Sequence, residues 1–423
     1  MNPNDDILAR SQALQSLATQ VFKPQTPITT KDLFAGRWSE LTAISDAVQQ
    51  SGLHVVIYGE RGVGKTSLAN VVEPTVFVLD NYGKKEEEHE RRIVVKAVAN
   101  TRDDFSVLWH RLLGEFNWPD KLLTPAHPDY MRTTREFFRL PEILNIDDVR
   151  RVMAAVPSAI YIIDEFDQAS RELSKHMTEL IKALSDLAID CTVILVGVSE
   201  TVDRLVEDHA SISRAINQVK VDRMKSVDLR KILENAENVL EMKFTEDAAS
   251  LIVHLSQGLP HYTHLIGVHA VRAAAVRLSL SKIEREDVFE ALKKAVKQAE
   301  QSVAEKHTTA IHSAQKKALY RQVLLACAVT AARNHDAMGY FSPSAVIGPL
   351  ADILKRPVTL ANFQNHLIEF SDAKRGPVLE RDGQPWGYRY RFRDPLVVPY
   401  IFMDGLESGI ASDEDLVQIL GQI

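Results

Sequence analysis

The sequence has few cysteines and few long apolar runs, and its first residues do not resemble a leader. Its 423 residues include two cysteines, Cys191 and Cys327. Both lie in apolar contexts, which indicates buried, reduced thiols rather than a disulfide or a metal site. The segment 1–6 is polar and acidic with no apolar core behind it, and the apolar run 323–332 is too short to cross a bilayer. We therefore expect a cytoplasmic protein with no membrane partner.

The chain also lacks a surplus of basic residues. It has 57 acidic and 50 basic side chains, for a formal net charge of −7. The molecule as a whole is therefore not drawn to nucleic acid, although a local basic patch could be. Hydrophobic residues make up 45% and charged residues 25%, as in an ordinary globular protein. A chain of this length predicts two or three domains.

The segment 59–66, GERGVGKT, fits the phosphate-binding pattern G-x-x-x-x-G-K-[ST]. An apolar run at 53–58 predicts a buried parallel strand before it, and the residues after it can start a helix. Glycines let the loop turn consecutive N–H groups into one concavity. We expect the phosphates to contact Gly59, Glu60, Arg61, Gly62, Val63, Gly64, Lys65, Thr66 and Ser67.

Two of these side chains have predicted roles of their own. Lys65 can reach the β- and γ-phosphates of ATP, and the Thr66 hydroxyl can ligate Mg²⁺. The alternative is a glycine-rich turn that binds nothing. A second motif argues against that alternative.

This second motif is an apolar run at 159–163 that ends in Asp164 and Glu165. Ligands of a doubly wound sheet bind at the carboxyl ends of the strands, so both acids would face the phosphates. We predict that Asp164 holds Mg²⁺, directly or through water, and that Glu165 is the base for a hydrolytic water. The alternative is a strand that ends in two solvated acids. The glycine loop and the acidic pair together resemble the Walker A and Walker B motifs of AAA+ ATPases.

Two further segments resemble the origin-initiator and STAND branches of that family. The segment 34–41, FAGRWSEL, is similar to the box before the first strand, which lies beside the adenine in the family. Gly258-Leu259-Pro260 resembles the GxP motif, which implies that Pro260 lies near the adenine. Many AAA+ proteins carry a sensor-2 arginine close to this proline. Here no arginine follows Pro260 until Arg272, and this departure from the family pattern implies slow turnover.

The resemblance also implies two polar positions after the acidic pair. Sensor 1 would be Ser199 or Glu200, at the end of the apolar strand predicted at 191–199. Arg214 would be an arginine finger presented to the ATP of a neighbouring subunit, with Arg223 as a weaker candidate. The alternative for Arg214 is an ordinary surface or intrachain ion pair. We count Glu165, Lys65, Arg214 and Ser199 as the catalytic set.

The resemblance implies an α/β fold, with the P-loop doubly wound parallel sheet of an AAA+ module and a helical lid. We assign 1–30 to an N-terminal helix and connector, 31–224 to the ATPase core and 225–300 to the lid. Residues 301–423 would form a mainly α, winged-helix-like domain. The N-terminal helix could pack on the chain's own core or on a neighbouring subunit. Within the core, 75–79 and 92–98 are expected to be strands.

The last segment predicts three helices, at 314–332, 342–354 and 359–370, and a hairpin around the turn at Asp382-Gly383. The hairpin would carry a basic face that could bind DNA, made by Arg381, Arg389, Arg391 and Arg393. A protein contact is an equal alternative. Elsewhere, His261, His264 and His269 lie at helical spacing. No acid or cysteine completes a metal site with these three histidines.

These motifs predict an ATP-binding, Mg²⁺-dependent and slowly hydrolysing molecular switch. Its nucleotide state would control homo-oligomeric assembly and engagement of DNA or a partner protein. One alternative is a signalling or defence scaffold that recruits an effector protein without binding DNA. Another is a degenerate ATPase that binds nucleotide only for stability.

Overall fold

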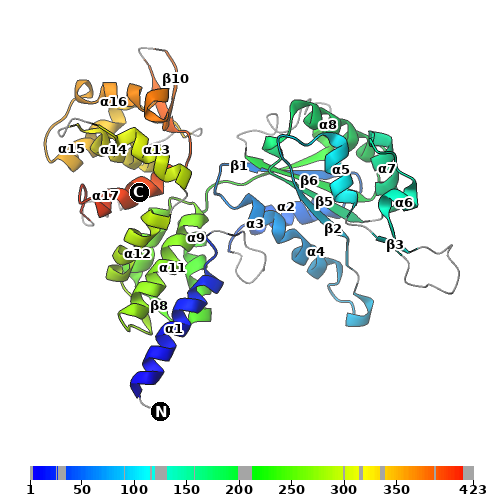
Figure 1. Ribbon diagram of the computed structural model, residues 1–423, viewed down its shortest axis with the longest axis horizontal. Helices are drawn as coiled ribbons and strands as arrows, with labels where there is room; N and C mark the ends of the chain where they lie inside the picture. The colour runs from blue at the N-terminus through cyan, green and yellow to red at the C-terminus, as the bar shows by residue number, and fades with distance from the viewer. Residues whose placement is uncertain are drawn as a thin grey trace. The chain divides into compact units, whose positions relative to one another are not determined.

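The computed structural model describes residues 3–24, 26, 35–89, 91–114, 117–119, 131–156, 158–198, 212–298, 301–313, 318–333, 339–384 and 387–412. The chain forms two compact units (Figure 1). One is Pro27–Asp222, and the other combines Met1–Thr26 with Arg223–Ile423. Among the described residues, no helix is both long enough and apolar enough to span a bilayer.

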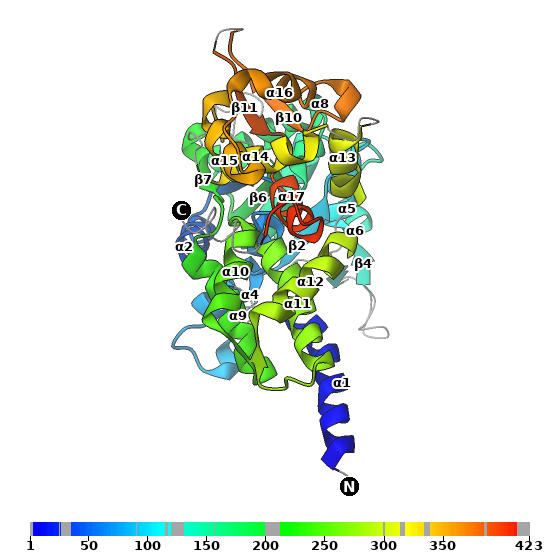
Figure 2. The same cartoon turned by 90° about the vertical axis from the view of Figure 1, so that its left-hand side faces the viewer.

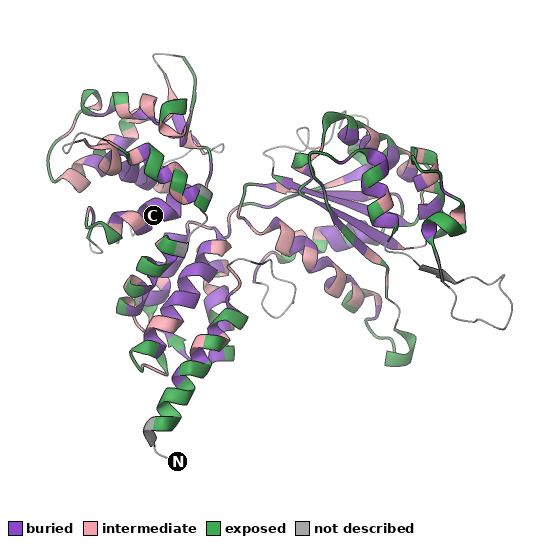
Figure 3. Ribbon diagram, viewed as in Figure 1, coloured by how far each residue is buried: buried purple, intermediate pink, exposed green. Residues whose placement is uncertain are grey.

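The unit Pro27–Asp222 is built on a five-stranded parallel sheet in the order β2-β5-β6-β1-β7. Both faces of the sheet are covered, which explains why the three central strands β5, β6 and β1 are buried almost throughout, whereas burial alternates in the edge strands β2 and β7. Figure 3 shows buried residues along the strands and on the helix faces turned towards them. The strands are β1 (His54–Gly59), β2 (Val94–Val98), β5 (Ala159–Asp164), β6 (Cys191–Val198) and β7 (Ile216–Lys220). This sheet confirms the predicted doubly wound fold.

Helices flank the sheet on both sides, with α5, α7 and α8 over one face and α2, α3 and α4 over the other (Figure 1). A short antiparallel pair, β3 (Asn117–Pro119) and β4 (Met131–Thr133), leads into α6 (Thr134–Phe138). The flanking helices are α2 (Trp38–Val48), α3 (Lys65–Asn70), α4 (Val72–Asp80), α5 (Phe105–Leu113), α7 (Ile146–Ala155) and α8 (Arg171–Asp186).

The prediction of a strand at 75–79 is wrong, because these residues belong to α4. The buried positions Val72, Thr75 and Val76 follow helical spacing, whereas Val78 and Leu79 are about half exposed. The run of β-branched residues suggested a strand, but its burial repeats every three to four residues rather than every two.

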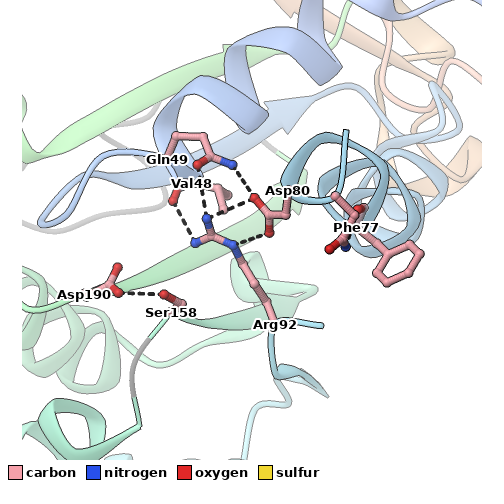
Figure 4. Close-up of polar contacts among 8 residues, drawn as sticks. Val48, Gln49, Phe77, Asp80, Arg92, Ser158 and Asp190 are labelled. Atoms are coloured by element: carbon pink, nitrogen blue, oxygen red, sulfur yellow. Dashed lines mark hydrogen bonds and ion pairs between the residues drawn. The ribbon is translucent and has the colours of Figure 1, made fainter. Parts of the chain in front are cut away.

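Arg92 holds the end of α4 beside the end of α2 (Figure 4). Its Nε lies 2.6 Å from Asp80 Oδ2, and its Nη2 donates to Gln49 Oε1 at 3.1 Å. Gln49 closes the ring by donating to Asp80 Oδ1 at 2.7 Å, and Arg92 Nη1 donates to the Val48 carbonyl at 3.3 Å. The last residue of the helix is thus anchored by several charge-assisted bonds.

The second unit contains a helical bundle that packs with the N-terminal helix α1 (Pro3–Val21). α1 lies against α11, and its N-terminal end extends past the bundle (Figure 2). Phe22 is buried over Gly267, where an added Cβ would lie 2.6 Å from the Phe22 ring. The sequence left open whether this helix packs on its own chain or on a neighbouring subunit. In the structure, α1 packs on its own chain, against α11 of the bundle. The bundle contains α9 (Ser226–Leu240), α10 (Glu246–Ser256), α11 (Pro260–Val276) and α12 (Arg285–Gln298), with the short pair β8 (Lys243–Phe244) and β9 (Lys282–Ile283).

The C-terminal part of the same unit is mainly helical and carries an antiparallel ribbon of two strands. A bridge between Phe341 and Tyr390 adds one more pairing to the ribbon. The predicted helices at 342–354 and 359–370 each begin as a 3-10 turn, at Pro343–Val346 and Leu360–Asn362. The elements are α13 (Gln301–Ile311), α14 (Tyr320–Arg333), α15 (Ile347–Leu354), α16 (Gln364–Glu369), β10 (Leu379–Asp382), β11 (Arg389–Phe392) and α17 (Val397–Glu407).

Both cysteines are buried and free of disulfides, as predicted. Burial raises the pKa of Cys191 to about 12 and also raises the pKa of Cys327, because the thiolate form is penalised away from water.

Candidate nucleotide-binding site

The glycine loop leaves β1 with a backbone that only glycine adopts easily. Gly59 has φ 151°, and a Cβ there would lie 2.3 Å from the carbonyl oxygen of Val221. Gly64 has φ 96° and directly precedes α3, which begins at Lys65. The spacing of the glycines therefore reflects a close approach at one end of the loop and a left-handed residue at the other.

Lys65 lies folded into this loop and is only 7% exposed. Its ammonium donates to the carbonyl oxygens of Gly59 at 3.0 Å and Glu60 at 2.7 Å. Burial lowers the pKa of Lys65 to about 8, against the opposing charges of Asp167 and Asp164. An ammonium held by main-chain oxygens can exchange them for phosphate oxygens, which carry more negative charge.

Thr66 and Asp164 meet at the carboxyl end of β5, as the two motifs predict. The Thr66 hydroxyl donates to Asp164 Oδ1 at 3.4 Å, and the Glu165 amide donates to the same oxygen at 2.9 Å. Asp164 is 4% exposed. A hydroxyl beside a carboxylate supplies the hard oxygen ligands that suit Mg²⁺, which usually keeps several waters and also binds substrate phosphate. The residues present therefore fit the expected metal.

Glu165 occupies a left-handed conformation, with φ 53°. That region costs a residue with a side chain roughly 1 kcal/mol or more. The residue is exposed and starts the 3-10 turn Phe166–Gln168. Its carboxylate is thus presented to solvent directly beside Asp164, a placement compatible with a base that acts on water.

Asp167 is a site residue that the sequence reasoning missed. Its Oδ1 accepts a hydrogen bond of 2.8 Å from the amide of Val198, at the end of β6, and its charge acts on Lys65. The 3-10 turn after Glu165 brings this second aspartate back towards the loop. The signal was present as a third acid in the sequence Asp164-Glu165-Phe166-Asp167.

Lys96 and Asn70 were also missed. The Lys96 ammonium lies 3.2 Å from Asp164 Oδ2 and donates to Asn70 Oδ1 at 2.6 Å. Lys96 is on β2 and Asn70 is the last residue of α3. The strand pair β2–β5 sets this contact, and the sequence alone does not reveal which strand neighbours β5.

Arg37 connects the segment 34–41 to the glycine loop. It has φ 62° and immediately precedes α2. Its guanidinium donates to Glu40 Oε1 at 2.9 Å, to the Val63 carbonyl at 3.3 Å and to the Asp222 carbonyl. The arginine and glutamate of the predicted box thus brace the loop from outside.

Arg214 lies at the amino-terminal ends of the strands, whereas the glycine loop lies at their carboxyl ends. It sits in the 3-10 turn Ser213–Ala215 just before β7, whose first residue Ile216 pairs with His54 at the start of β1. Its side chain is 85% exposed, and its Nη2 lies 3.4 Å from Asp186 Oδ1. The alternative of an intrachain ion pair is therefore present, but exposed pairs of this kind are weak.

The remaining predicted positions are Ser199, Glu200, Pro260 and Arg223. Ser199 and Glu200, and with them the sensor-1 prediction, lie outside the described residues. Pro260 begins α11 in the other unit. Arg223 packs against Gly258, because a Cβ added at Gly258 would lie 2.7 Å from the Cβ of Arg223. The Arg223 guanidinium donates to the Gln257 carbonyl at 3.5 Å.

Two of the three histidines predicted at helical spacing, His264 and His261, contact the segment that follows α1. His264 is buried and its Nδ1 accepts from the Lys23 amide at 3.4 Å, while His261 Nδ1 lies 2.8 Å from the Pro24 carbonyl. Burial lowers the pKa of His264 to about 4. No cluster of three or more potential metal ligands (His, Cys, Asp or Glu) occurs in the described part of the chain.

Comparisons with solved structures bear on the fold of this chain. No curated protein sequence matches the chain. Among solved structures, the Walker-type ATPase PABY2304 of Pyrococcus abyssi is 15% identical with a TM-score of 0.50, over 89% of this chain and 99% of that one. The ORC2 protein of Aeropyrum pernix is 14% identical with a TM-score of 0.49, over 96% of this chain and 98% of that one. The first of these likenesses supports a shared fold.

The family model described as novel STAND NTPase 1 matches residues 25–340, which is most of the chain and includes the glycine loop and the acidic pair. The chain therefore belongs to the novel STAND NTPase 1 family, a family of nucleoside-triphosphatases.

Proposed function

We propose that this NTPase is an ATP- and Mg²⁺-dependent switch that hydrolyses ATP slowly. Its nucleotide state would control the assembly of a homo-oligomer and the engagement of another macromolecule. The observation that supports this most directly is the meeting of Lys65, Thr66 and Asp164 at the carboxyl edge of the sheet.

Each residue would act through charge and position. Lys65 would leave the carbonyls of Gly59 and Glu60 for the β- and γ-phosphates, and the loop amides of 59–67 would bind the remaining oxygens. Thr66 and Asp164 would hold Mg²⁺, which supplies charge neutralisation when bound. The Glu165 carboxylate would take a proton from the attacking water. The lack of an arginine at 261–271 supports slow turnover.

The link from nucleotide to assembly would be Arg214. An exposed guanidinium at the end of the strands opposite the loop is placed for the triphosphate of another subunit, and its weak ion pair with Asp186 is easily exchanged. We further propose that 225–300 acts as the nucleotide lid, with Pro260 at the adenine. Residues 1–30 and 31–224 keep their assignments as connector and ATPase core.

The partner is proposed to contact residues 301–423, as a winged-helix-like domain. The succession α14, α15, α16 and the antiparallel β10–β11 ribbon supports this assignment. Arg391 pairs with Glu380 at 2.9 Å and Arg389 with Asp382 at 2.7 Å, so much of the positive charge of the ribbon is neutralised. This pairing favours a protein partner, as in a signalling or defence scaffold. DNA binding through Arg381 and Arg393 is the second candidate.

Particle mass tests the switch. The protein is measured by light scattering with ADP, with a non-hydrolysable ATP analogue, and with the analogue plus duplex DNA. We expect a larger particle with the analogue than with ADP. An equal mass in both nucleotides, with nucleotide bound, would reject control of assembly. A further rise with DNA that disappears at higher salt would support the second candidate.

A further inference from the structure

The ion pair between Lys96 and Asp164 stands beside the predicted metal-binding oxygens, and nothing in the proposed mechanism uses it. In the β2–β5 pair, Lys96 lies opposite Ile162, and Val98 lies opposite Asp164. Lys96 and Asp164 are therefore diagonal neighbours on one face of the sheet, within reach of a long side chain. The contact follows from the register of the two strands.

The Asp164 carboxylate is held from two sides. Oδ1 accepts from the Thr66 hydroxyl at 3.4 Å, and Oδ2 lies 3.2 Å from the Lys96 ammonium. Lys96 is itself fixed by Asn70, whose Oδ1 is 2.6 Å from the ammonium. Thr66 and Asn70 are four residues apart in α3 and so lie on the same face of that helix. One face of α3 thus positions both groups that act on the carboxylate.

The charges explain what such an arrangement can do. A nearly buried carboxylate beside a phosphate site repels phosphate unless a cation neutralises it. Lys96 supplies that cation from the chain itself, and its side chain is 31% exposed, so the ammonium can move outward when a metal takes its place. The lysine and Mg²⁺ would then be alternative cations for the same carboxylate.

We propose, on the basis of the nucleotide switch described above, that Lys96 is a built-in counter-cation of Asp164 that lets the site hold a nucleoside diphosphate with little dependence on Mg²⁺. Lys96 is a positioning residue in this scheme, because it acts on the phosphates through Asp164. A resting state with bound ADP would then survive changes in free Mg²⁺. A purely structural ion pair would instead affect the stability of the fold and leave the effect of Mg²⁺ on ADP affinity unchanged.

The test measures the ADP dissociation constant by calorimetry in Mg²⁺ and in EDTA, and takes the ratio of the two. We expect the wild-type ratio to stay within about tenfold, since Asp164 is neutralised in both buffers. In Lys96→Met the EDTA affinity should fall by about a further tenfold or more, while the affinity in saturating Mg²⁺ is kept. Lys96→Arg keeps the charge and should restore the wild-type ratio.

Lys231→Met is the matched control, because Lys231 is an exposed lysine of α9 in the other unit. A Lys96→Met ratio equal to that of the wild type would overturn the proposal. So would a wild-type protein whose ADP affinity drops by roughly 100-fold or more in EDTA, and this measurement decides the matter even if Lys96→Met does not fold. A wild-type protein that binds ADP in neither buffer would instead reject the proposed nucleotide switch itself.

Discussion

The glycine loop and the β10–β11 ribbon both carry positive side chains that the sequence predicts to bind phosphate, but the partners of these side chains differ in the structure. Lys65 donates to two main-chain carbonyls, which a phosphate can replace. Arg389 and Arg391 instead form ion pairs with Asp382 and Glu380 on the neighbouring strand. A motif with fixed spacing specifies where its cation points, whereas a count of arginines does not specify their partners.

The ribbon pairs follow from its register. Glu380 lies directly opposite Arg391, and Asp382 lies opposite Arg389. Opposite charges at such positions attract across the strands. Tyr340 adds to this arrangement, since both guanidiniums lie 4.6 Å from the centre of its ring. The predicted hairpin is confirmed. Its cross-strand register places acidic residues opposite two of the arginines, so its basic face is partly neutralised.

The largest expected effect lies at the loop. Lys65→Ala should abolish detectable ATP binding, a loss of roughly 1,000-fold, because a charged donor to two phosphates is removed. Calorimetry measures the affinity, with Arg391→Ala as the control that removes a ribbon cation and should leave ATP binding intact. Retained binding in Lys65→Ala would remove the contrast between the two regions.

The next effect separates binding from chemistry within the loop region. Glu165→Gln keeps the size of the side chain but removes the base, so ATP hydrolysis should fall by roughly 100-fold while ATP affinity stays the same. Phosphate release measures the rate, and calorimetry confirms binding. If the variant hydrolyses ATP at the wild-type rate, Glu165 is not the base and its exposed left-handed position needs another explanation.

Much of the fold could be predicted from local patterns. Apolar runs gave four of the five sheet strands closely, because buried parallel strands are apolar on both faces. The error at 75–79 arose where a β-branched run is helical, and only the burial of Val72, Thr75 and Val76 reveals its period. The docking of α1 on α11 joins residues far apart in sequence, such as Ser11 and Ala275, and no local pattern predicts that.

The site was predictable to the extent that its residues lie in short motifs. Lys65, Thr66, Asp164 and Glu165 lie where the spacing placed them. Asp167 required a view of the 3-10 turn after Glu165, and Lys96 required the order and register of the strands. Contacts between distant strands are set by topology, which one sequence does not display.

A moderate effect is expected at the far edge of the sheet. Arg214→Ala should weaken ATP-dependent assembly by about tenfold, since a guanidinium that reads a neighbour's phosphate is lost. Light scattering across protein concentrations measures it. Asp186→Ala is the matched control: it frees Arg214 from its 3.4 Å ion pair and should preserve or strengthen assembly. Wild-type assembly in Arg214→Ala would mean that the arginine serves only this intrachain pair.

The smallest effect is expected in the ribbon, and it tests whether pairing rather than charge number governs this region. Glu380→Gln together with Asp382→Asn leaves every arginine in place but removes the acids opposite Arg391 and Arg389. If the freed guanidiniums then meet phosphates, the slope of log affinity for duplex DNA against log salt should steepen by about one for each new contact. Filter binding over a range of salt concentrations measures the slope. The wild-type slope should be shallow, because Arg389 and Arg391 are already neutralised by acids of the neighbouring strand. Arg391→Ala in the wild-type background should change it little for the same reason. A steep wild-type slope that Arg391→Ala reduces would show that phosphate competes successfully with Glu380, and the two regions would then differ in strength of binding rather than in kind.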